Sequence, residues 1–402
     1  MQAKNFWITA MVAFLLNVSA FAIPKLPKEV RGFCIAAPSY NDLDNFIQFI
    51  DQELASRKVN LLIMRIDYNY QYTSHPELVT SEKRSNDPSS VAALSTSELK
   101  RIVEVCRKHK ITLVPQVNLF GHQSWASTLS PLLKKYPQFD ETPWIRMPDN
   151  YKWPNNDELY CKSYCPLHPE VHNIVFDLVD EIMEACETQH FHAGMDEVFY
   201  IGMGGCTRCA GLDRSKLFAD EVNKINEHIN AKNGRLWIWG DRMIDGKETK
   251  LGMWEGSTND TYRSIDMINK NVVINDWHYE SAPKTAEVFA AKGFDVMMCP
   301  WRKADVAKQQ VADYEAFKKS APKKDAKHYR GFVQTVWTSA SNFLQYMNGT
   351  KNEEKFSKIV GFTPLLPTEC PWRCFKKSIR LSLLPRKPNP TTSFRSFLDY
   401  WI

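Results

Sequence analysis

The stretch "FHAGMDEVFYIG", residues 191–202, sets an aspartate beside a glutamate in an otherwise apolar segment. Adjacent carboxylates are usually a solvated acidic loop, but the apolar residues around Asp196 and Glu197 make solvation unfavourable. Burial shifts carboxylate pKa values and suits such groups to proton transfer or to holding a positive charge. Neighbours within a strand point to opposite faces, whereas at a strand end the chain turns and both can reach one cavity. We therefore expect Asp196 and Glu197 to form a functional pair.

Aromatic residues recur near the ends of other predicted strands. They are Trp239, Trp277, Tyr279, Trp301 and Trp337, with Trp254 and Trp125 on nearby loops. Aromatic rings suit the apolar C–H faces of sugars, and Trp N–H and Tyr O–H groups add hydrogen-bond donors. Core packing is the alternative, but the interior of a barrel prefers branched aliphatic residues. The pattern predicts a carbohydrate pocket. The expected substrate-binding residues are Trp239, Trp254, Trp277, Trp301 and Trp337.

The elements that must position these residues follow a regular alternation. From Arg31 onward, apolar runs of strand length alternate with amphipathic runs of helix length, which is typical of repeated β-α units around a parallel sheet. The strand candidates are "RGFCIAAP", "NLLIMRIDY", "ITLVPQVNLFG", "HFHAGMDE", "LWIWGDR", "NVVINDW", "FDVMMCPW" and "GFVQTVW". Helices are expected at 42–58, 97–110, 171–187, 215–233, 282–292 and 304–319. The eight units predict an α/β fold of the (β/α)8 TIM-barrel type.

The main alternative is an open doubly wound sheet, which normally carries a glycine-rich turn after its first strand. The turn here is "APSYND", without glycine. In a barrel, catalytic groups come from the carboxyl ends of the strands, where Asp196 and Glu197 fall. The long connection 123–170 follows the third predicted strand, and long loops at that face usually build a site.

Two carboxylates on one strand end differ from the usual arrangement for glycoside hydrolysis. Ordinary glycosidases place two carboxylates on opposite sides of the bond, about 5 to 9.5 Å apart. The adjacent pair suits a reaction in which the substrate supplies its own nucleophile and one carboxylate only positions it. Asp276, Glu280 and Glu255 remain candidates for a conventional second carboxylate.

The two ends of the chain have compositions unlike the predicted barrel. Residues 1–22 have the pattern of a secretory signal peptide, with Lys4, an apolar run over 6–20 and a cleavage site of small residues at 20–22. The apolar run is shorter than the roughly 20 residues that a span needs, so we expect an exported protein without a stable membrane span. The catalytic domain is expected over 23–348, followed by a basic, Pro-rich segment of undetermined structure over 349–402.

Charge argues against nucleic acid as a partner. The formal charge is +5, and loss of Lys4 with the signal leaves +4, which is too small to indicate nucleic acid or an anionic membrane surface. Seven basic and no acidic residues lie between Cys370 and Phe397, so the basic excess belongs to that segment. We expect no cofactor, and the sequence does not predict the oligomeric state.

Ten cysteines in an exported chain favour some disulfides. Cys161 and Cys165 form one local pair and Cys206 and Cys209 another. Disulfides within these pairs are the favoured interpretation, and a zinc site formed by the four thiolates is the alternative. Buried thiols are expected at Cys34, Cys106, Cys186 and Cys299.

The residues around the carboxylate pair resemble glycoside hydrolase family 20, the β-N-acetylhexosaminidases, whose signature is His-x-Gly-Gly-Asp-Glu at the end of the fourth barrel strand. Residues 192–197 match it except for Met195, which replaces the second glycine and is expected to narrow the pocket or alter the turn. The following "VFYIG" is closer to the single-domain hexosaminidase D branch. The resemblance covers about residues 31–348.

The resemblance implies roles for particular residues. Glu197 would be the general acid and then the base, and Asp196 would orient the 2-acetamido group of the substrate. His122 and Asp67 would support the acid, and Tyr279 would donate to the acetamido oxygen. Trp337 would correspond to the family's pocket tryptophan.

Two positions depart from the family pattern. The usual arginine for the sugar hydroxyls is missing from "APSYND", and Thr338 and Ser339 replace the usual acidic residue near the last tryptophan. Arg302, Arg242 and Asp241 are candidate substitutes.

Three hypotheses follow. The first is an exported hydrolase that removes terminal β-linked N-acetylglucosamine or N-acetylgalactosamine from glycans, with retention and without a metal. The second is a carbohydrate-binding barrel of the same family that has lost turnover. The third is a zinc-stabilised scaffold.

Overall fold

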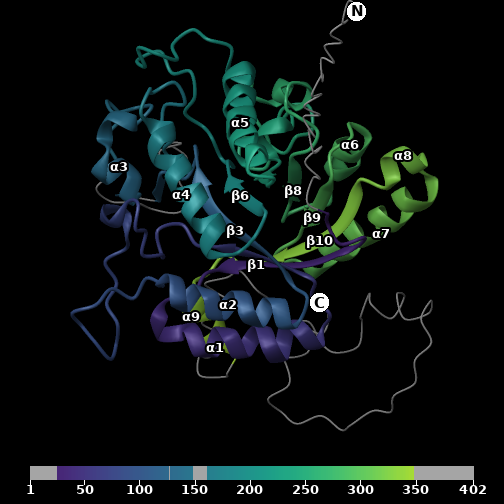
Figure 1. Ribbon diagram of the computed structural model, residues 1–402. Coiled ribbons are helices and arrows are strands. Elements are labelled where there is room, and N and C mark those ends of the chain that lie inside the picture. The colour runs from purple at the N-terminus through teal and green to yellow at the C-terminus, as the bar shows by residue number, and fades with distance from the viewer. Residues whose placement is uncertain (1–24, 126, 148–160, 348–402) are drawn as a thin grey trace, which may run out of the picture.

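The computed structural model describes residues 25–125, 127–147 and 161–347. Eight parallel strands close into one barrel, in the order β1-β10-β9-β8-β7-β6-β3-β2, so the predicted (β/α)8 fold is confirmed (Figure 1). The strands are β1 (Val30–Ala36), β2 (Leu61–Arg65), β3 (Thr112–Leu119), β6 (His190–Gly194), β7 (Arg235–Trp239), β8 (Val273–Trp277), β9 (Val296–Cys299) and β10 (Tyr329–Thr335). Each corresponds to one predicted strand.

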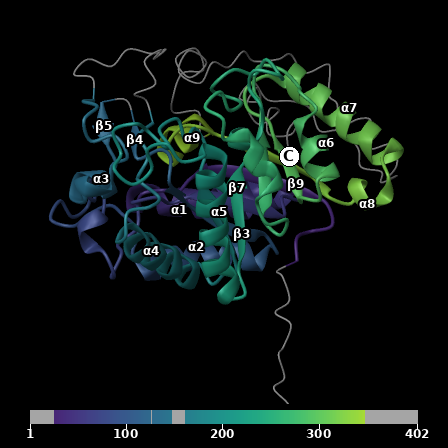
Figure 2. The same ribbon diagram turned by 90° about the horizontal axis from the view of Figure 1, so that it is seen from above.

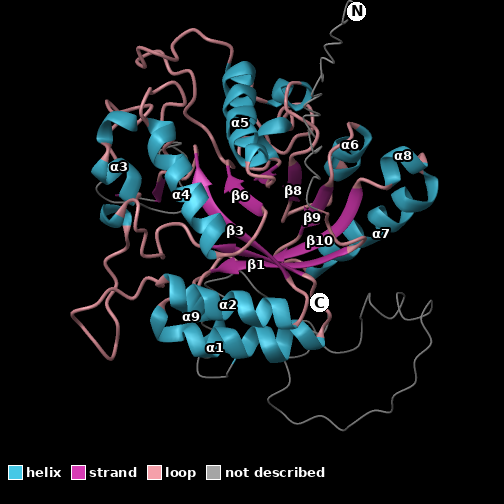
Figure 3. Ribbon diagram, in the orientation of Figure 1, coloured by secondary structure: helices cyan, strands magenta, loops and turns pink. Residues whose placement is uncertain are grey.

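Helices cover the outside of this barrel, as Figure 3 shows by the cyan ribbons around the magenta strands. The longer ones are α1 (Leu43–Gln48, continued by a π-helical stretch over Phe49–Leu54), α2 (Thr96–Lys108), α4 (Val171–Ala185), α5 (Arg214–Ala231), α6 (Thr285–Ala291), α7 (Ala304–Ser320) and α9 (Ala340–Met347). The short α8 (Lys323–Ala326) precedes β10. Helix α2 begins with a capping box in which Ser95 and Glu98 satisfy each other's backbone N–H groups. The six predicted helices are therefore present, with ends shifted by a few residues.

The connection between β3 and α4 carries short elements of its own. A two-stranded antiparallel sheet pairs β4 (Ser124–Trp125) with β5 (Thr128–Leu129), and α3 (Pro131–Lys135) follows. Figure 2, seen from above, places these elements together at one side of the barrel. This segment therefore forms part of the structure around the barrel mouth, as expected for a long loop at that face.

Tryptophan is part of the barrel interior. The buried interior cluster combines aliphatic residues such as Ile63 and Val114 with Trp237, Trp239 and Trp277. Trp237 and Trp239 are completely buried. The interior therefore departs from the aliphatic preference expected of a barrel, and a tryptophan at a strand end can be a core residue.

Two predicted segments fall outside the described residues. They are the signal peptide over 1–22 and the basic segment over 349–402, so their predictions stay predictions. Among the described residues, no helix combines the length and apolar character needed to cross a membrane.

Candidate active site

The chain turns sharply where β6 ends, and this turn presents the carboxylate pair. Gly194, Met195 and Glu197 all have positive φ angles, of 68°, 66° and 50°. This left-handed conformation is unfavourable for residues with a side chain, and such strain often accompanies functional sites. Met195 is completely buried in the hydrophobic core and is not among the residues that line the cavity. Met195 is therefore part of the left-handed turn and not of the cavity wall.

A partly buried histidine joins the two carboxylates. Nε2 of His122 lies 3.1 Å from Oδ2 of Asp196 and 3.3 Å from Oε2 of Glu197. Both carboxylates are less than 10% exposed. Oδ1 of Asp196 is buried and has no hydrogen-bond partner among the described residues. An unpaired buried oxygen is costly, so Asp196 is suited to accept a hydrogen bond from a bound ligand.

The surroundings separate the pKa values of the two carboxyl groups. Burial raises the pKa of Glu197 to about 7, and the negative charge of Asp196 adds to the rise while His122 opposes it. Burial also acts on Asp196, but the charge and hydrogen bond of His122 hold the pKa of Asp196 below its ordinary value. The pKa of His122 is raised to about 9, because Asp196 and Glu197 outweigh the effect of burial. The pKa values of the two carboxyl groups are therefore shifted in opposite directions, a separation that suits one group to give a proton and the other to stay ionised.

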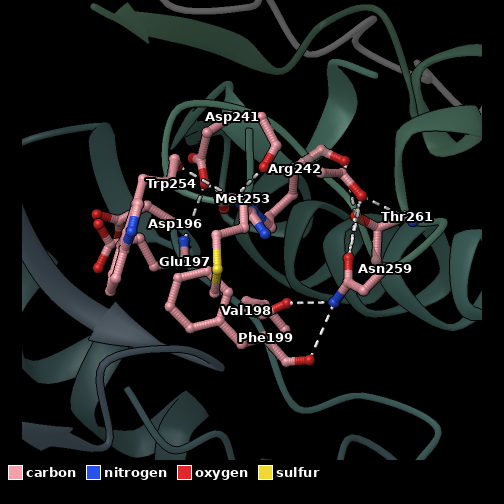
Figure 4. Close-up of polar contacts among 12 residues, drawn as sticks. Asp196, Glu197, Val198, Phe199, Asp241, Arg242, Met253, Trp254, Asn259 and Thr261 are labelled. Carbon is pink, nitrogen blue, oxygen red and sulfur yellow. Dashed lines mark hydrogen bonds and ion pairs between the residues drawn. The ribbon is translucent and has the colours of Figure 1, made fainter. Parts of the chain in front are cut away.

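Residues after β7 hold the backbone of Glu197, as Figure 4 shows. Oδ2 of Asp241 accepts a 2.9 Å hydrogen bond from the Glu197 N–H. Arg242 donates to that same oxygen at 2.7 Å and to the carbonyl oxygens of Met253 and Gly256. Asp241 and Arg242 are each 1% exposed. They therefore brace Glu197 and are not available as substitutes for the missing sugar-binding arginine.

Cys161 is a site residue that sequence reasoning missed. Its thiol donates to Oε2 of Glu197 at 3.2 Å, and its sulfur lies 3.3 Å from Nδ1 of His122. It was expected to pair with Cys165, but all eight described cysteines are free. The favoured disulfides within the two local pairs are therefore not present. No sequence pattern indicated that Cys161 would lie beside Glu197.

The carboxylate pair opens into a cavity of about 960 Å³. Its aromatic wall includes the predicted residues Trp254, Trp277, Tyr279, Trp301 and Trp337, together with Trp125. Nε1 of Trp337 donates to the Tyr279 hydroxyl oxygen at 2.7 Å, and the Trp301 ring packs edge-on against Tyr279. The structure therefore brings together residues from several strand ends that are far apart in the sequence.

Trp239 lies elsewhere. It is completely buried in the barrel interior, where it packs against His192 and Trp337, and it does not line the cavity. The structure thus places Trp239 beneath a pocket residue, where it was predicted to bind substrate.

Asp67, predicted to support the acid, lines the cavity, and its side chain hydrogen-bonds to the backbone. Its Oδ1 accepts from the Asn118 N–H at 2.8 Å. Burial raises the pKa of Asp67, and the charges of Arg65 and His122 oppose that rise, so His122 is electrostatically coupled to Asp67. This agrees with a supporting role at the base of the site.

The candidates for a conventional second carboxylate have other partners. Asp276 and Glu255 accept from opposite nitrogens of the buried His278, at 3.1 and 3.0 Å. Glu280 is exposed and pairs with Arg302 and Lys303. Asp67, Asp196 and Glu197 are the carboxylates among the described residues that line the cavity. Within the described ranges, no carboxylate lies opposite Glu197 in the manner of an ordinary glycosidase.

Polar groups for sugar hydroxyls are nevertheless present. Arg65, Arg302, Thr338 and Ser339 line the cavity. The Arg65 guanidinium stacks 4.6 Å from the Trp337 ring centroid and donates to the Val336 carbonyl, and its Nε has no partner among the described residues. Arg65 ends β2, so this strand places a cation at the cavity.

A carboxylate pair with divided pKa values in an aromatic barrel mouth defines a carbohydrate-active (β/α)8 site. Comparison with known proteins agrees. The model of glycosyl hydrolase family 20, catalytic domain, matches residues 29–370. The chain therefore belongs to glycosyl hydrolase family 20, as its sequence motif predicted.

Relatives and solved structures share this family at low identity. A lacto-N-biosidase from Bifidobacterium bifidum is 21% identical over 301 residues, 70% of this chain and 22% of the relative. A beta-hexosaminidase from Porphyromonas gingivalis is 21% identical over 370 residues, 83% of this chain and 44% of the relative. A crystal structure of a beta-N-acetylhexosaminidase superimposes with a TM-score of 0.57 at 18% identity, covering 82% of this chain and 74% of that one. The chain spans less than half of the length of the two curated relatives.

The predicted closeness to the hexosaminidase D branch has weaker support. Hexosaminidase D from Bos taurus is 22% identical over 199 residues, which is 48% of this chain and 49% of the relative. That branch assignment stays a prediction.

Proposed function

We propose that the chain removes terminal β-linked N-acetylhexosamine from glycans by a retaining reaction in which the substrate's own amide is the nucleophile. One observation carries the proposal: Glu197, with its raised pKa, adjoins an anionic Asp196 whose buried Oδ1 has no partner in the part of the chain that the structure describes. The first group suits protonation of a leaving oxygen, and the second suits acceptance of an amide N–H.

In the first step, the acetamido carbonyl oxygen attacks the anomeric carbon while Glu197 gives its proton to the departing glycosidic oxygen. The C–O bond to the aglycone breaks and a cyclic, positively charged oxazolinium forms. Asp196 accepts the amide N–H and stabilises that charge. The Tyr279 oxygen accepts from Trp337, and its hydroxyl would donate to the acetamido oxygen.

In the second step, Glu197 takes a proton from water as the water attacks the anomeric carbon. The ring opens, the acetamido group is restored and the product keeps its β configuration. His122 stays protonated between the carboxylates and limits their mutual repulsion. This chemistry requires no metal at the carboxylate pair.

The test compares 4-nitrophenyl β-N-acetylglucosaminide, the matching galactosaminide and the non-acetylated β-glucoside. Wild type should hydrolyse an N-acetylated substrate and spare the glucoside. Glu197→Gln should lower kcat at least ~10³-fold, and Asp196→Asn should lower it ~10²- to 10³-fold, with circular dichroism unchanged. Equal turnover of the glucoside, or full activity in Asp196→Asn, would show that the amide is not the nucleophile. Binding of product without release of nitrophenol would support the impaired, binding-only barrel.

We also propose export, which the composition of residues 1–22 supports. Expression of the full chain in a secretion-competent host should yield a mature N-terminus near Ile23 outside the cytoplasm. Retention of Met1 in the cell fraction would contradict it.

A further inference from the structure

A second cluster of potential ligands lies away from the cavity. Glu141, Cys165, Cys206 and Cys209 are all buried, and their ligand atoms lie within 4.8 Å of one another. The Cys165 sulfur is 3.6 Å from that of Cys206 and 3.3 Å from that of Cys209. Tetrahedral zinc with bonds of about 2.3 Å to sulfur places its thiolates about 3.8 Å apart, so small movements would admit the ion.

The groups around the cluster favour a cation in its centre. Oε1 of Glu141 accepts from the Met203 N–H at 3.1 Å, but Oε2 is buried and has no partner among the described residues. A bound cation would compensate this unpaired buried carboxylate oxygen beside the three sulfur atoms.

Disulfide formation does not account for this arrangement. The three thiols meet one another, so any one bond between two of them leaves a third buried thiol beside the unpaired Glu141 oxygen. Cys161, the fourth member of the sequence-based set, instead contacts Glu197. Glu141 takes its place in the cluster.

We propose that Cys165, Cys206, Cys209 and Glu141 bind one structural zinc ion. The four ligands close the coordination sphere and leave no position for substrate, which is the pattern of a structural site. The ion would join the β3–α4 connection, which also carries Cys161, to the loop that follows Asp196 and Glu197. It would thereby fix the positions of these two segments beside the active site. This role does not depend on which sugar the site accepts.

The experiment measures zinc in protein expressed with added Zn²⁺ and purified without chelator. His122, Cys161 and Glu197 form another group of potential ligands, so the parent for these measurements is Cys161→Ser. That parent should contain one zinc per chain by elemental analysis. Adding Cys165→Ser, Cys206→Ser or Cys209→Ser should abolish it, and adding Cys186→Ser, a buried thiol near Cys106, should not. Glu141→Gln should weaken zinc binding at least ~10-fold against a chelating dye.

A second measurement does not depend on the folding of the cysteine variants. A strong chelator should lower the Tm of the Cys161→Ser parent, and Zn²⁺ but not Mg²⁺ should restore it. Failure of that protein to bind added Zn²⁺, or a mapped disulfide between any two of the three cysteines, would overturn the proposal. Activity on glycosides decides neither outcome, so the zinc site and the proposed hydrolysis can fail separately.

Discussion

At the scale of single residues, the site depends on two neighbouring carboxyl groups that differ in pKa. Asp196 and Glu197 share burial and a neighbour in His122, yet their pKa values move in opposite directions. Their types and adjacency could be predicted from one contiguous motif. Cys161 could not, because its contact with Glu197 joins residues 36 positions apart and depends on how a long loop folds back.

The thiol of Cys161 should affect the pKa of Glu197. In wild type, kcat for an N-acetylated aryl glycoside should fall as pH rises through about 7, because Glu197 must carry its proton to protonate the leaving oxygen. The Cys161 hydrogen bond lowers the pKa of Glu197 against the larger effect of burial. Cys161→Ala should therefore shift this basic limb to higher pH by ~0.3–1 unit, measured from kcat between pH 4 and 9.

Cys186→Ala is the matched control for loss of a buried thiol and should keep the wild-type pH profile. A purely structural role for Cys161 would lower kcat equally at all pH values. If the basic limb of the kcat–pH profile did not move in Cys161→Ala, Cys161 would not influence the pKa of Glu197.

At the scale of elements, the site needs strand ends that approach closely. Gly121 follows β3, and a Cβ there would overlap the carbonyl oxygen of Asp196 and lie 3.1 Å from Cγ2 of Val198. The turn after β6 thus lies directly against the backbone after β3. Strand periodicity predicted β3 and β6 but not this approach, because backbone contacts between loops leave no repeating pattern. The two-residue strands β4 and β5 were missed for the same reason.

Gly121→Ala should displace the turn that carries the catalytic pair while the barrel persists. Misplacement of reacting groups by about 1 Å can cost ~10²-fold in rate, so kcat/KM should fall at least ~10-fold. The control is Gly204→Ala, because a Cβ at Gly204 meets nothing within 4 Å. Kinetics and thermal unfolding of both variants make the comparison. Wild-type kcat/KM in Gly121→Ala would mean that the turn tolerates displacement.

At the scale of the whole molecule, the barrel could be predicted because eight apolar runs repeat along the sequence. Which strand-end tryptophans line the cavity and which are buried in the barrel interior could not be predicted. Trp239 and Trp277 both end barrel strands, yet one is completely buried in the interior and the other lines the cavity. Asp241 shows the same limit, since its support of Glu197 joins neighbouring strand ends 44 residues apart.

Burial of Glu197 also affects the stability of the whole folded molecule. The raised pKa of Glu197 means that its ionised form is less favourable in the folded than in the unfolded chain. Below the ordinary pKa of glutamate the group is protonated in both states and has no effect. As pH rises toward about 7, wild type loses stability relative to Glu197→Gln, by on the order of 1–3 kcal/mol. Asp196 has the opposite sign, because its lowered pKa stabilises the fold above the ordinary value of aspartate.

Unfolding of wild type, Glu197→Gln and Asp196→Asn at pH 4.5 and pH 8 separates these contributions. At pH 8, Glu197→Gln should be more stable than wild type and Asp196→Asn less stable. Only the Glu197→Gln difference should shrink at pH 4.5, because Glu197 is then protonated in the folded chain. The Asp196→Asn difference should persist, because pH 4.5 is still above the ordinary pKa of aspartate. Tm by calorimetry or the midpoint in urea reports the order. If the two variants changed stability in the same direction at pH 8, the pair would not be divided into a neutral acid and a permanent anion.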